Sequence, residues 1–290
     1  DSDTTNAIMA TGGNGGNGAD GGGGGNGLTV TVPSRTVTNT AAGTLHGGDG
    51  GTGIIYFGVL VGTGGAGGAG LAGSGLNVIN DGHIEGGEGG TGDTRISFSS
   101  GAGGAGITGA THVINSGSII GGLSGGLTPI RANAIEFTGT ANTLEVRKGS
   151  TIVGNVMGAA GASNTLALGG TVDDSFDTSQ IGNTAQYRNF TDFQKIGTST
   201  YTLTGTTTAV TPWSVLGGTL AISSDNNLGA TSAPLILDGG TLQNTASFST
   251  ARAVTLGAAG GTVNTDAAIT TVMSGVISGA GALTKTGAGA

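Results

Sequence analysis

The feature of this sequence that most limits its fold is a short repeat in its second half. Leu220, Leu242, Val263 and Leu283 each follow a glycine-containing turn, at spacings of 22, 21 and 20 residues. A repeat of this length is too short for a pair of helices or a propeller blade, but it fits one coil of a β-solenoid, in which successive coils stack. The repeat therefore predicts an all-β chain folded as a parallel β-helix.

The glycine content is the second unusual feature. The 290 residues include 65 glycines, and only 9% are charged, whereas ordinary globular proteins carry about 25% charged residues. Disorder needs low hydrophobicity and high net charge, but here the mean hydropathy is positive. Collagen is excluded because glycine does not hold every third position and there are four prolines. A repetitive β structure is what this composition still allows.

Charge and cysteine content restrict the partners of the chain. It carries 9 basic and 17 acidic residues, a net charge of −8, and Arg147-Lys148 is the only pair of adjacent cations. Nucleic acids and anionic membranes are bound mainly through Lys and Arg, so neither is an expected partner. The chain has no cysteine, which excludes disulfides and thiolate sites. No cofactor is predicted.

Three segments differ in composition. Residues 1–27 are rich in Gly and Asn and are expected to be mobile, residues 28–141 to form glycine-rich solenoid rungs, and residues 142–290 to form a regular β-helix that stops within a repeat. In the second segment, Asn80–Gly87 is repeated 35 residues later as Asn115–Gly122. Asn and Gly tolerate the left-handed backbone of tight bends, so each copy is interpreted as one coil.

Glycine runs such as residues 64–70 and 101–106 separate these copies. They admit two interpretations. The favoured one is flexible loops that project from the coils. The other is tight rungs, in which the missing side chains let backbones approach closely.

The ends of the sequence suggest a piece of a longer exported protein. It begins at Asp1 without Met, shows no signal peptide, and ends within a repeat. No apolar run approaches the ~20 residues that a membrane span requires.

The second half resembles the passenger domain of type V autotransporters, specifically the passenger-associated strand repeat. Thr219–Gly229, Leu237–Leu242 and Gly275–Gly287 carry the resemblance, which covers about residues 142–290. It implies a right-handed parallel β-helix, exported through a C-terminal outer-membrane translocator barrel and displayed on a Gram-negative cell. Most members are adhesins with roles in autoaggregation and biofilm formation. A minority carry proteases or esterases, usually as a distinct domain.

One match to a catalytic motif occurs. Gly122-Leu123-Ser124-Gly125-Gly126 fits the nucleophile elbow G-x-S-x-G. A hydrolase of that type needs an acid and then a His after the serine, but the last histidine is His112. In a chain this rich in glycine the match is expected by chance, so no catalytic role is predicted for Ser124.

Metal sites are not predicted either. Gly15–Asp20 fits the start of a calcium-binding nonapeptide, but the hydrophobic residue is missing, and Gly89–Asp93 places its Asp one position early. Flexible turns are the favoured interpretation of both. His46, His83 and His112 fall at different phases of the repeat, whereas zinc needs three or four converging ligands. They are expected to be surface or turn histidines.

The least repetitive part of the second half is residues 173–195. Asp173, Asp174 and Asp177 form the densest acidic cluster, with Arg188 the nearest cation in sequence. Such acids bind calcium in β-helical polysaccharide lyases, but a solvated loop is favoured here. Four aromatic residues share this stretch, and they are expected to fill the coil interior, or, in the alternative, to form an exposed binding patch. They are Phe176, Tyr187, Phe190 and Phe193.

The Thr-rich run 204–208 raises ice binding or glycan binding as a hypothesis. Ice binding needs Thr-x-Thr units on the same face of successive coils, but the Thr-x-Thr units of this sequence do not recur at the coil period. Threonine is also simply a good strand residue.

The sequence thus predicts a non-enzymatic cell-surface adhesin or self-association module. Its expected partners are host or bacterial surfaces, or a second passenger, although no individual binding residue is identified. The alternative is an inert stalk that presents a functional tip lying elsewhere. A more remote alternative is an enzyme of the β-helical lyase type.

Overall fold

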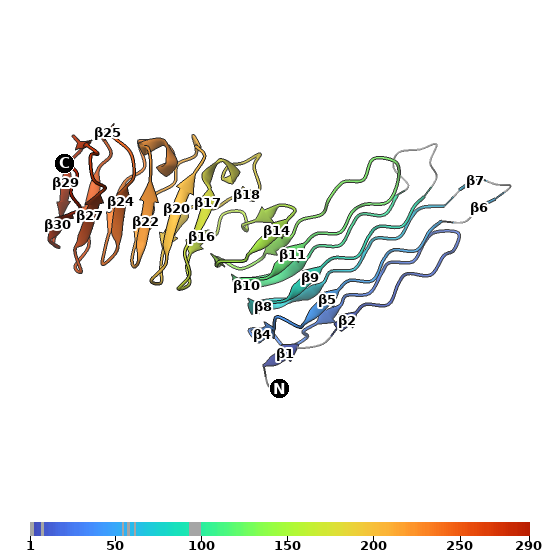
Figure 1. Cartoon of the computed structure of the whole chain (residues 1–290). Coiled ribbons are helices and arrows are strands. Elements are labelled where there is room, and N and C mark those ends of the chain that lie inside the picture. Colours follow the sequence, from blue (N-terminus) through green and yellow to red (C-terminus); the bar gives the residue numbers. More distant parts are fainter. Residues whose placement is uncertain (1–2, 7–8, 54, 57–58, 61, 93–99) are drawn as a thin grey trace. The chain divides into compact units, whose positions relative to one another are not determined.

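The computed structural model describes residues 3–6, 9–53, 55–56, 59–60, 62–92 and 100–290. Within these residues the chain forms strands β1 to β30, two short 3-10 helices and no α-helix (Figure 1). No helix among them is long and apolar enough to cross a membrane. The chain divides into two compact units. Unit 1 comprises Asp1–Asn142 and Gly149–Ala162, and unit 2 comprises Thr143–Lys148 and Ser163–Ala290.

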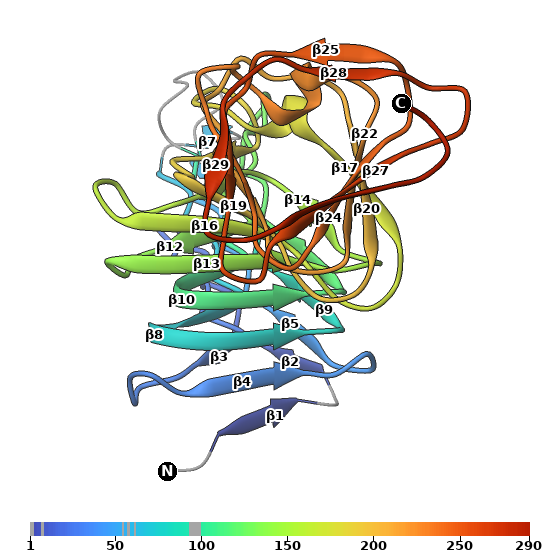
Figure 2. The same ribbon diagram turned by 90° about the vertical axis from the view of Figure 1, so that its left-hand side faces the viewer.

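Unit 1 is built of stacked coils, and each coil contributes one strand to each of two walls of parallel strands. The first wall is β1 (Thr4–Asn6), β4 (Thr36–Asn39), β8 (Leu71–Asn80), β10 (Ile107–Asn115), β12 (Ile135–Phe137) and β15 (Val156–Met157), with β3 (Leu28–Thr29) beside β8. The second wall is β2 (Met9–Thr11), β5 (Thr44–His46), β9 (His83–Glu85), β11 (Ser118–Ile120) and β14 (Thr151–Val153). A small antiparallel pair is β6 (Ile55–Tyr56) and β7 (Val59–Leu60). Figure 2 shows β1, β4, β8 and β10 lying one above another.

Stacked apolar residues form the core of unit 1. In the first wall Val78 lies opposite Val37 on one side and Val113 on the other. In the second wall Ile84 lies between Leu45 and Ile119. All of these side chains are buried. Because strand side chains alternate between faces, one apolar residue per wall and coil is enough to give a continuous column.

A ladder of buried asparagines marks the bend between the walls. Asn6, Asn39, Asn80 and Asn115 each end a strand of the first wall. The side-chain nitrogen of each donates to the side-chain oxygen of the next, at 2.8, 2.8 and 2.7 Å. Asn115 donates in turn to Ser150 Oγ at 2.6 Å. The ladder satisfies polar atoms that water cannot reach, and it confirms the interpretation of Asn80–Gly87 and Asn115–Gly122 as successive coils.

Beyond the second wall, the coils that contain β2, β5 and β9 each continue into an outgoing and a returning glycine-rich segment (Figure 1). The pairs are residues 12–18 with 21–27, 47–53 with 62–70, and 86–92 with 101–106. Backbone partners repeat every third residue. The N–H groups of the first outgoing segment bond to the next coil from Gly12 to His46, Gly15 to Asp49 and Gly18 to Thr52. A strand would repeat every second residue, so a period of three identifies polyproline II type helices.

A second set of hydrogen bonds runs diagonally and closes the array. Gly48 and Gly51 donate to Gly25 and Gly22 of the preceding coil, at 2.7 and 2.8 Å. Gly65 donates to Gly51 in its own coil at 2.9 Å. A Cβ at Gly50 would overlap the carbonyl oxygen of Gly65, so only glycine permits this approach.

Where the third residue of a turn is Asn or Asp, its side chain caps the next coil. Asn14 and Asn17 accept the N–H groups of Asp49 and Thr52 at 2.9 and 2.7 Å. Asp49 accepts the N–H group of Glu88 at 2.8 Å. The glycine runs are therefore close-packed rungs, and the favoured interpretation as flexible loops is wrong. Residues 12–27 belong to the same array.

Unit 2 also has two parallel walls, with fewer residues per coil. The first is β13 (Ala141–Val146, from Thr143), β16 (Ser163–Leu168), β19 (Asp192–Lys195), β21 (Trp213–Val215), β23 (Leu235–Leu237), β26 (Val254–Leu256) and β29 (Ile277–Gly279). The second is β17 (Asp174–Asp177), β20 (Thr200–Thr204), β22 (Thr219–Ile222), β24 (Thr241–Asn244), β27 (Gly261–Thr265) and β30 (Leu283–Thr286). The remaining elements are β18 (Tyr187–Arg188), β25 (Phe248–Thr250), β28 (Thr271–Met273), η1 (Thr178–Gln180) and η2 (Asp225–Leu228).

The structure confirms three of the four repeat anchors and corrects the fourth. Leu220, Leu242 and Val263 lie opposite one another and are buried. Lys285, not Leu283, lies opposite Val263, and Leu283 lies opposite Gly261 with 42% of its surface exposed. The last coil therefore takes 22 residues from Val263 to Lys285. The two-residue shift keeps Leu283 on the same face because strand faces alternate with period two.

Taken unit by unit, these parallel in-register walls confirm the predicted all-β parallel solenoid.

Candidate functional site

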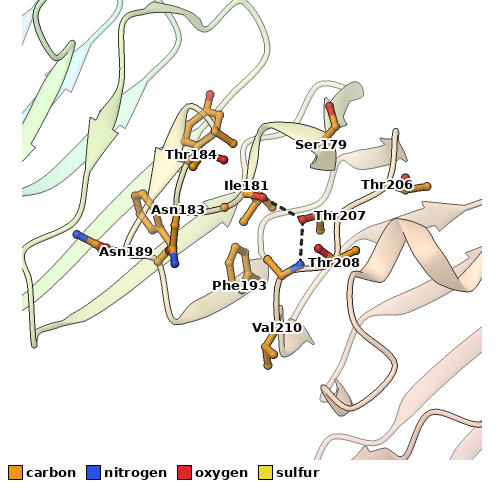
Figure 3. Close-up of a pocket in the computed structure, with 15 residues that line it drawn as sticks. Ser179, Ile181, Asn183, Thr184, Asn189, Phe193, Thr206, Thr207, Thr208 and Val210 are labelled. Carbon is orange, nitrogen blue, oxygen red and sulfur yellow. Dashed lines mark hydrogen bonds between the residues drawn. The ribbon is translucent and has the colours of Figure 1, made fainter.

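A pocket of about 600 Å³ lies in unit 2, between the loop that precedes β19 and the loop that joins β20 to β21 (Figure 3). Both loops occupy the same corner of consecutive coils. The lining residues are Ser179, Ile181, Gly182, Asn183, Thr184, Ala185, Tyr187, Asn189, Phe190, Phe193 and Thr206 to Val210. None of these residues carries a formal charge.

Local hydrogen bonds fix the first loop. Asp177 caps η1 by accepting the N–H group of Ser179 at 2.9 Å. Gly182 and Tyr187 close a turn, with an N–H to carbonyl distance of 3.1 Å. Arg188 donates from Nε to the carbonyl oxygen of Ala185 at 2.6 Å. The guanidinium group therefore supports the loop from within and does not line the pocket.

The second loop is tied to the first through Thr207. Its hydroxyl group donates to the carbonyl oxygen of Ile181 at 2.9 Å and accepts the N–H group of Ala209 at 3.1 Å (Figure 3). Thr206 and Thr208, on either side of it, are exposed. The pocket thus has one fixed threonine flanked by two solvent-facing ones.

Aromatic residues form the apolar wall. Phe193 is 1% exposed and its ring packs 5.4 Å from that of Trp213. Tyr187 is buried between Phe176, at 5.3 Å, and Phe190, at 6.4 Å between ring centroids. Burial raises the pKa of the Tyr187 hydroxyl to about 12.

The expectation that these aromatics fill the coil interior holds for three of the four. Phe176, Tyr187 and Phe193 are buried in the coil, while Phe190 is only half buried and lines the pocket with Tyr187 and Phe193. The sequence pointed to this stretch because it breaks the repeat. It did not identify Asn183, Thr184 or Asn189, since an Asn or Thr in a loop has no pattern that separates it from any turn residue.

The acidic cluster is dispersed among separate partners. Asp173 accepts the N–H group of Thr200 at 2.6 Å, Asp174 pairs with Lys148 Nζ at 3.1 Å, and Asp177 caps η1. In the described part of the chain, no group of three or more His, Asp or Glu residues is arranged to hold a metal.

The other motif residues occupy unit 1. Ser124 Oγ accepts the N–H group of Ile130 at 2.8 Å. His112 lies opposite Asn77 in the first wall. Asp20 accepts both the N–H and the hydroxyl group of Thr63, and these bonds hold the pKa of its carboxyl group below the usual value. Asp93 lies outside the described residues.

Two of the three histidines meet at one carboxylate on the second wall of unit 1. His46 lies opposite Glu85 in register. The Nε2 atoms of His46 and His83 lie 3.7 and 3.1 Å from Glu85 Oε2. All three side chains are about one third exposed, so these are surface residues of a strand.

A parallel β-solenoid with a polar pocket at its corner is consistent with a passenger domain. The chain is distantly similar to a curated protein described as the adhesin BmaC autotransporter of Brucella suis biovar 1 (strain 1330). The two are 31% identical over 130 residues, which is 45% of this chain and 3% of that protein. This similarity and the parallel β fold bear out the resemblance to autotransporter passengers. No family model matches the chain, and no solved structure matches it.

Proposed function

We propose that this chain is part of an autotransporter passenger that is displayed on a Gram-negative cell and acts as an adhesin. The observation that carries the proposal is the distant similarity to an autotransporter adhesin in a chain made of stacked parallel coils. The full-length protein would then contain an outer-membrane translocator barrel. Its partners would be host or bacterial surfaces, or a passenger on a neighbouring cell.

The proposed mechanism is multivalent, non-covalent contact. Many copies on one cell gain avidity without a strong individual site. A chain with 9% charged residues would approach another surface with little electrostatic repulsion at physiological salt, because screening acts beyond about 8 Å. The pocket of unit 2 and the outward residues of the glycine-rich array supply repeated polar groups for such contacts.

Adhesion of the isolated chain is the test. Beads coated with the 290-residue chain are scored for clumping with one another and for binding to bacterial, epithelial and matrix surfaces. Albumin-coated beads are the control, and soluble chain is the competitor. Clumping or saturable, competed binding supports the proposal.

Inert beads would contradict the proposal if circular dichroism shows that the coated chain retains its β structure. The chain would then act as a stalk that presents a tip elsewhere in the protein. Cleavage of acidic polysaccharides that is lost in Asp173→Asn, Asp174→Asn and Asp177→Asn variants would instead favour a lyase.

A further inference from the structure

We propose that the pocket of unit 2 binds a neutral sugar unit of a surface glycan. This inference rests on the proposed function, because it names the ligand class of one contact made by an adhesin. It commits to a binding site that neither the fold nor the similarity to an adhesin assigns.

The size of the pocket fits a small ligand. Its volume of about 600 Å³ lies within the range of roughly 300–1,000 Å³ that is usual for small-molecule sites. Its two loops hold their shape through Thr207 and Arg188, each of which is bonded to backbone carbonyl groups of the first loop. A site with fixed walls loses little entropy when a ligand binds.

The charge of the pocket selects against ionised ligands. The lining residues are all uncharged, and the nearby cation Arg188 is engaged with the carbonyl oxygens of Ala185 and Thr184. A carboxylate or sulfate in the pocket would lack a counter-ion, and an unpaired charge removed from water is strongly unfavourable. A neutral ligand meets no such penalty.

The polar groups of the pocket match a polyhydroxyl ligand. Hydroxyl groups come from Ser179, Thr206 and Thr208, which are exposed, and a side-chain amide comes from Asn183, which is also exposed. Hydroxyl and amide groups both donate and accept hydrogen bonds, as sugar hydroxyl groups do. The density of these groups is higher than in a pocket for an apolar ligand, where only a few polar atoms fix the orientation.

The aromatic wall supplies the remaining element. In Figure 3, the ring of Phe193 lies between the asparagines Asn183 and Asn189 and the side chain of Val210. Phe190 is half buried beside it. The ring of Phe193 is 1% exposed, so Phe190 supplies the accessible aromatic face. A sugar ring presents a C–H face as well as hydroxyl edges, and it would lie with the C–H face toward Phe190 and the hydroxyl groups toward the threonines.

The test uses the whole 290-residue chain and defined sugars. Saturation-transfer NMR and calorimetry are run with galactose, glucose, mannose, N-acetylglucosamine and lactose, and with glucuronic acid and sialic acid as charged probes. We expect weak, saturable binding of at least one neutral sugar and none of the acids. In the Thr206→Val/Thr208→Val and Phe190→Ala variants, affinity falls by about tenfold or more, as expected when hydrogen bonds or an apolar wall of a site are removed.

The matched control is Thr198→Val/Thr202→Val, in which two exposed threonines of the same unit lie outside the pocket. It should bind as the unmodified chain does. Absence of binding by every neutral sugar, or affinity that is the same in the pocket variants, overturns the inference. If beads adhere while no sugar binds, the pocket inference fails and the adhesin proposal stands. If sugar binds while beads are inert, the adhesin proposal fails and the pocket inference stands.

Discussion

Arg252 and Asp225 form a buried ion pair between two coils of unit 2. Arg252 Nε lies 3.0 Å from Asp225 Oδ1 and Nη2 lies 3.2 Å from Oδ2, so the contact is bidentate. The side chains are 2% and 10% exposed. The remaining guanidinium donors reach carbonyl oxygens of residues 229, 230 and 233, and Thr250 donates to Asp225 at 2.8 Å.

Arg252→Met should therefore destabilise unit 2. Removing one partner of a buried pair leaves the other charge unpaired, which costs about 3–5 kcal/mol of unfolding free energy. Trp213, the only tryptophan of the chain, is buried in this unit, so its fluorescence during urea unfolding reports the change. Lys148→Met is the control, because its pair with Asp174 is exposed and contributes less than about 1 kcal/mol. Equal effects of the two variants would contradict the prediction.

The asparagine ladder should be sensitive to a single truncation. In Asn80→Ala, the side-chain oxygen of Asn115 loses the donor that Asn80 provides, and a buried unsatisfied group costs about 1–3 kcal/mol. The amide of Asn39 loses its contact with Asn80 but keeps the carbonyl oxygens of Gly43 and His83. Hydrogen exchange of the amides of β4, β8 and β10 should speed up. Asn77→Ala, an exposed site on the same strand, should leave exchange unchanged. Indistinguishable exchange in the two variants would show that the ladder is not stabilising.

The close-packed glycine array predicts a strong positional effect of one methyl group. Gly50→Ala places a Cβ onto the carbonyl oxygen of Gly65, whereas at Gly16 a Cβ meets nothing within 4 Å. We expect Gly50→Ala to lose exchange protection at Gly48, Gly51 and Gly65, whose N–H groups bond across the array. Gly16→Ala should retain it. Equal protection in both would mean that the segments are not packed this closely in solution.

Lys195 should make the stability of unit 2 depend on pH. Its Nζ is buried and donates to the carbonyl oxygen of Ile196 at 2.6 Å. Burial lowers its pKa to about 8, and Asp173 and Glu145 oppose this only in part. Between the folded pKa and the usual value of about 10.4, the unfolded chain binds the extra proton, so stability rises with pH.

The expected gain between pH 8 and pH 10 is about 2 kcal/mol. Above pH 10 it reverses, because burial raises the pKa of Tyr187 and of Tyr201 and the unfolded tyrosines ionise first. Urea midpoints followed by Trp213 fluorescence measure this. In Lys195→Met the rise from pH 8 to pH 10 should vanish. A rise that persists in this variant would refute the assignment to Lys195.

The apolar repeat of one core residue per coil could be predicted from the sequence. The three-residue period of the glycine-rich runs was not recognised. Leu220, Leu242 and Val263 were placed correctly because the core needs an apolar residue in each coil. Leu283 was misplaced because its glycine turn resembles the earlier turns, while the pairing of Gly261 decides the register. Close-packed rungs were only the alternative interpretation although Asn14, Asn17 and Asp20 stand three residues apart, because this period holds within a single run and glycine does not hold every third position over the whole chain.

The candidate pocket was only partly foreseeable. The break in the repeat over residues 173–195 located the first loop, because a loop that leaves the coil also leaves its pattern. Thr206, Thr207 and Thr208 belong to the following coil, and their position opposite Ile181 depends on the register of β17 with β20. Nothing local in the sequence encodes that pairing.

The period of three in the glycine-rich array separates the glycines that form the scaffold from the variable residues on its surface. In the inner coils two residues of a turn, such as Gly47 and Gly48, are constrained as glycine by neighbouring backbone, while the third position of the array holds Asn, Asp, Thr, Glu or Ala. Three residues of a polyproline II helix span about 9 Å. The surface is thus a grid whose chemistry can change by single substitutions while the fold stays the same.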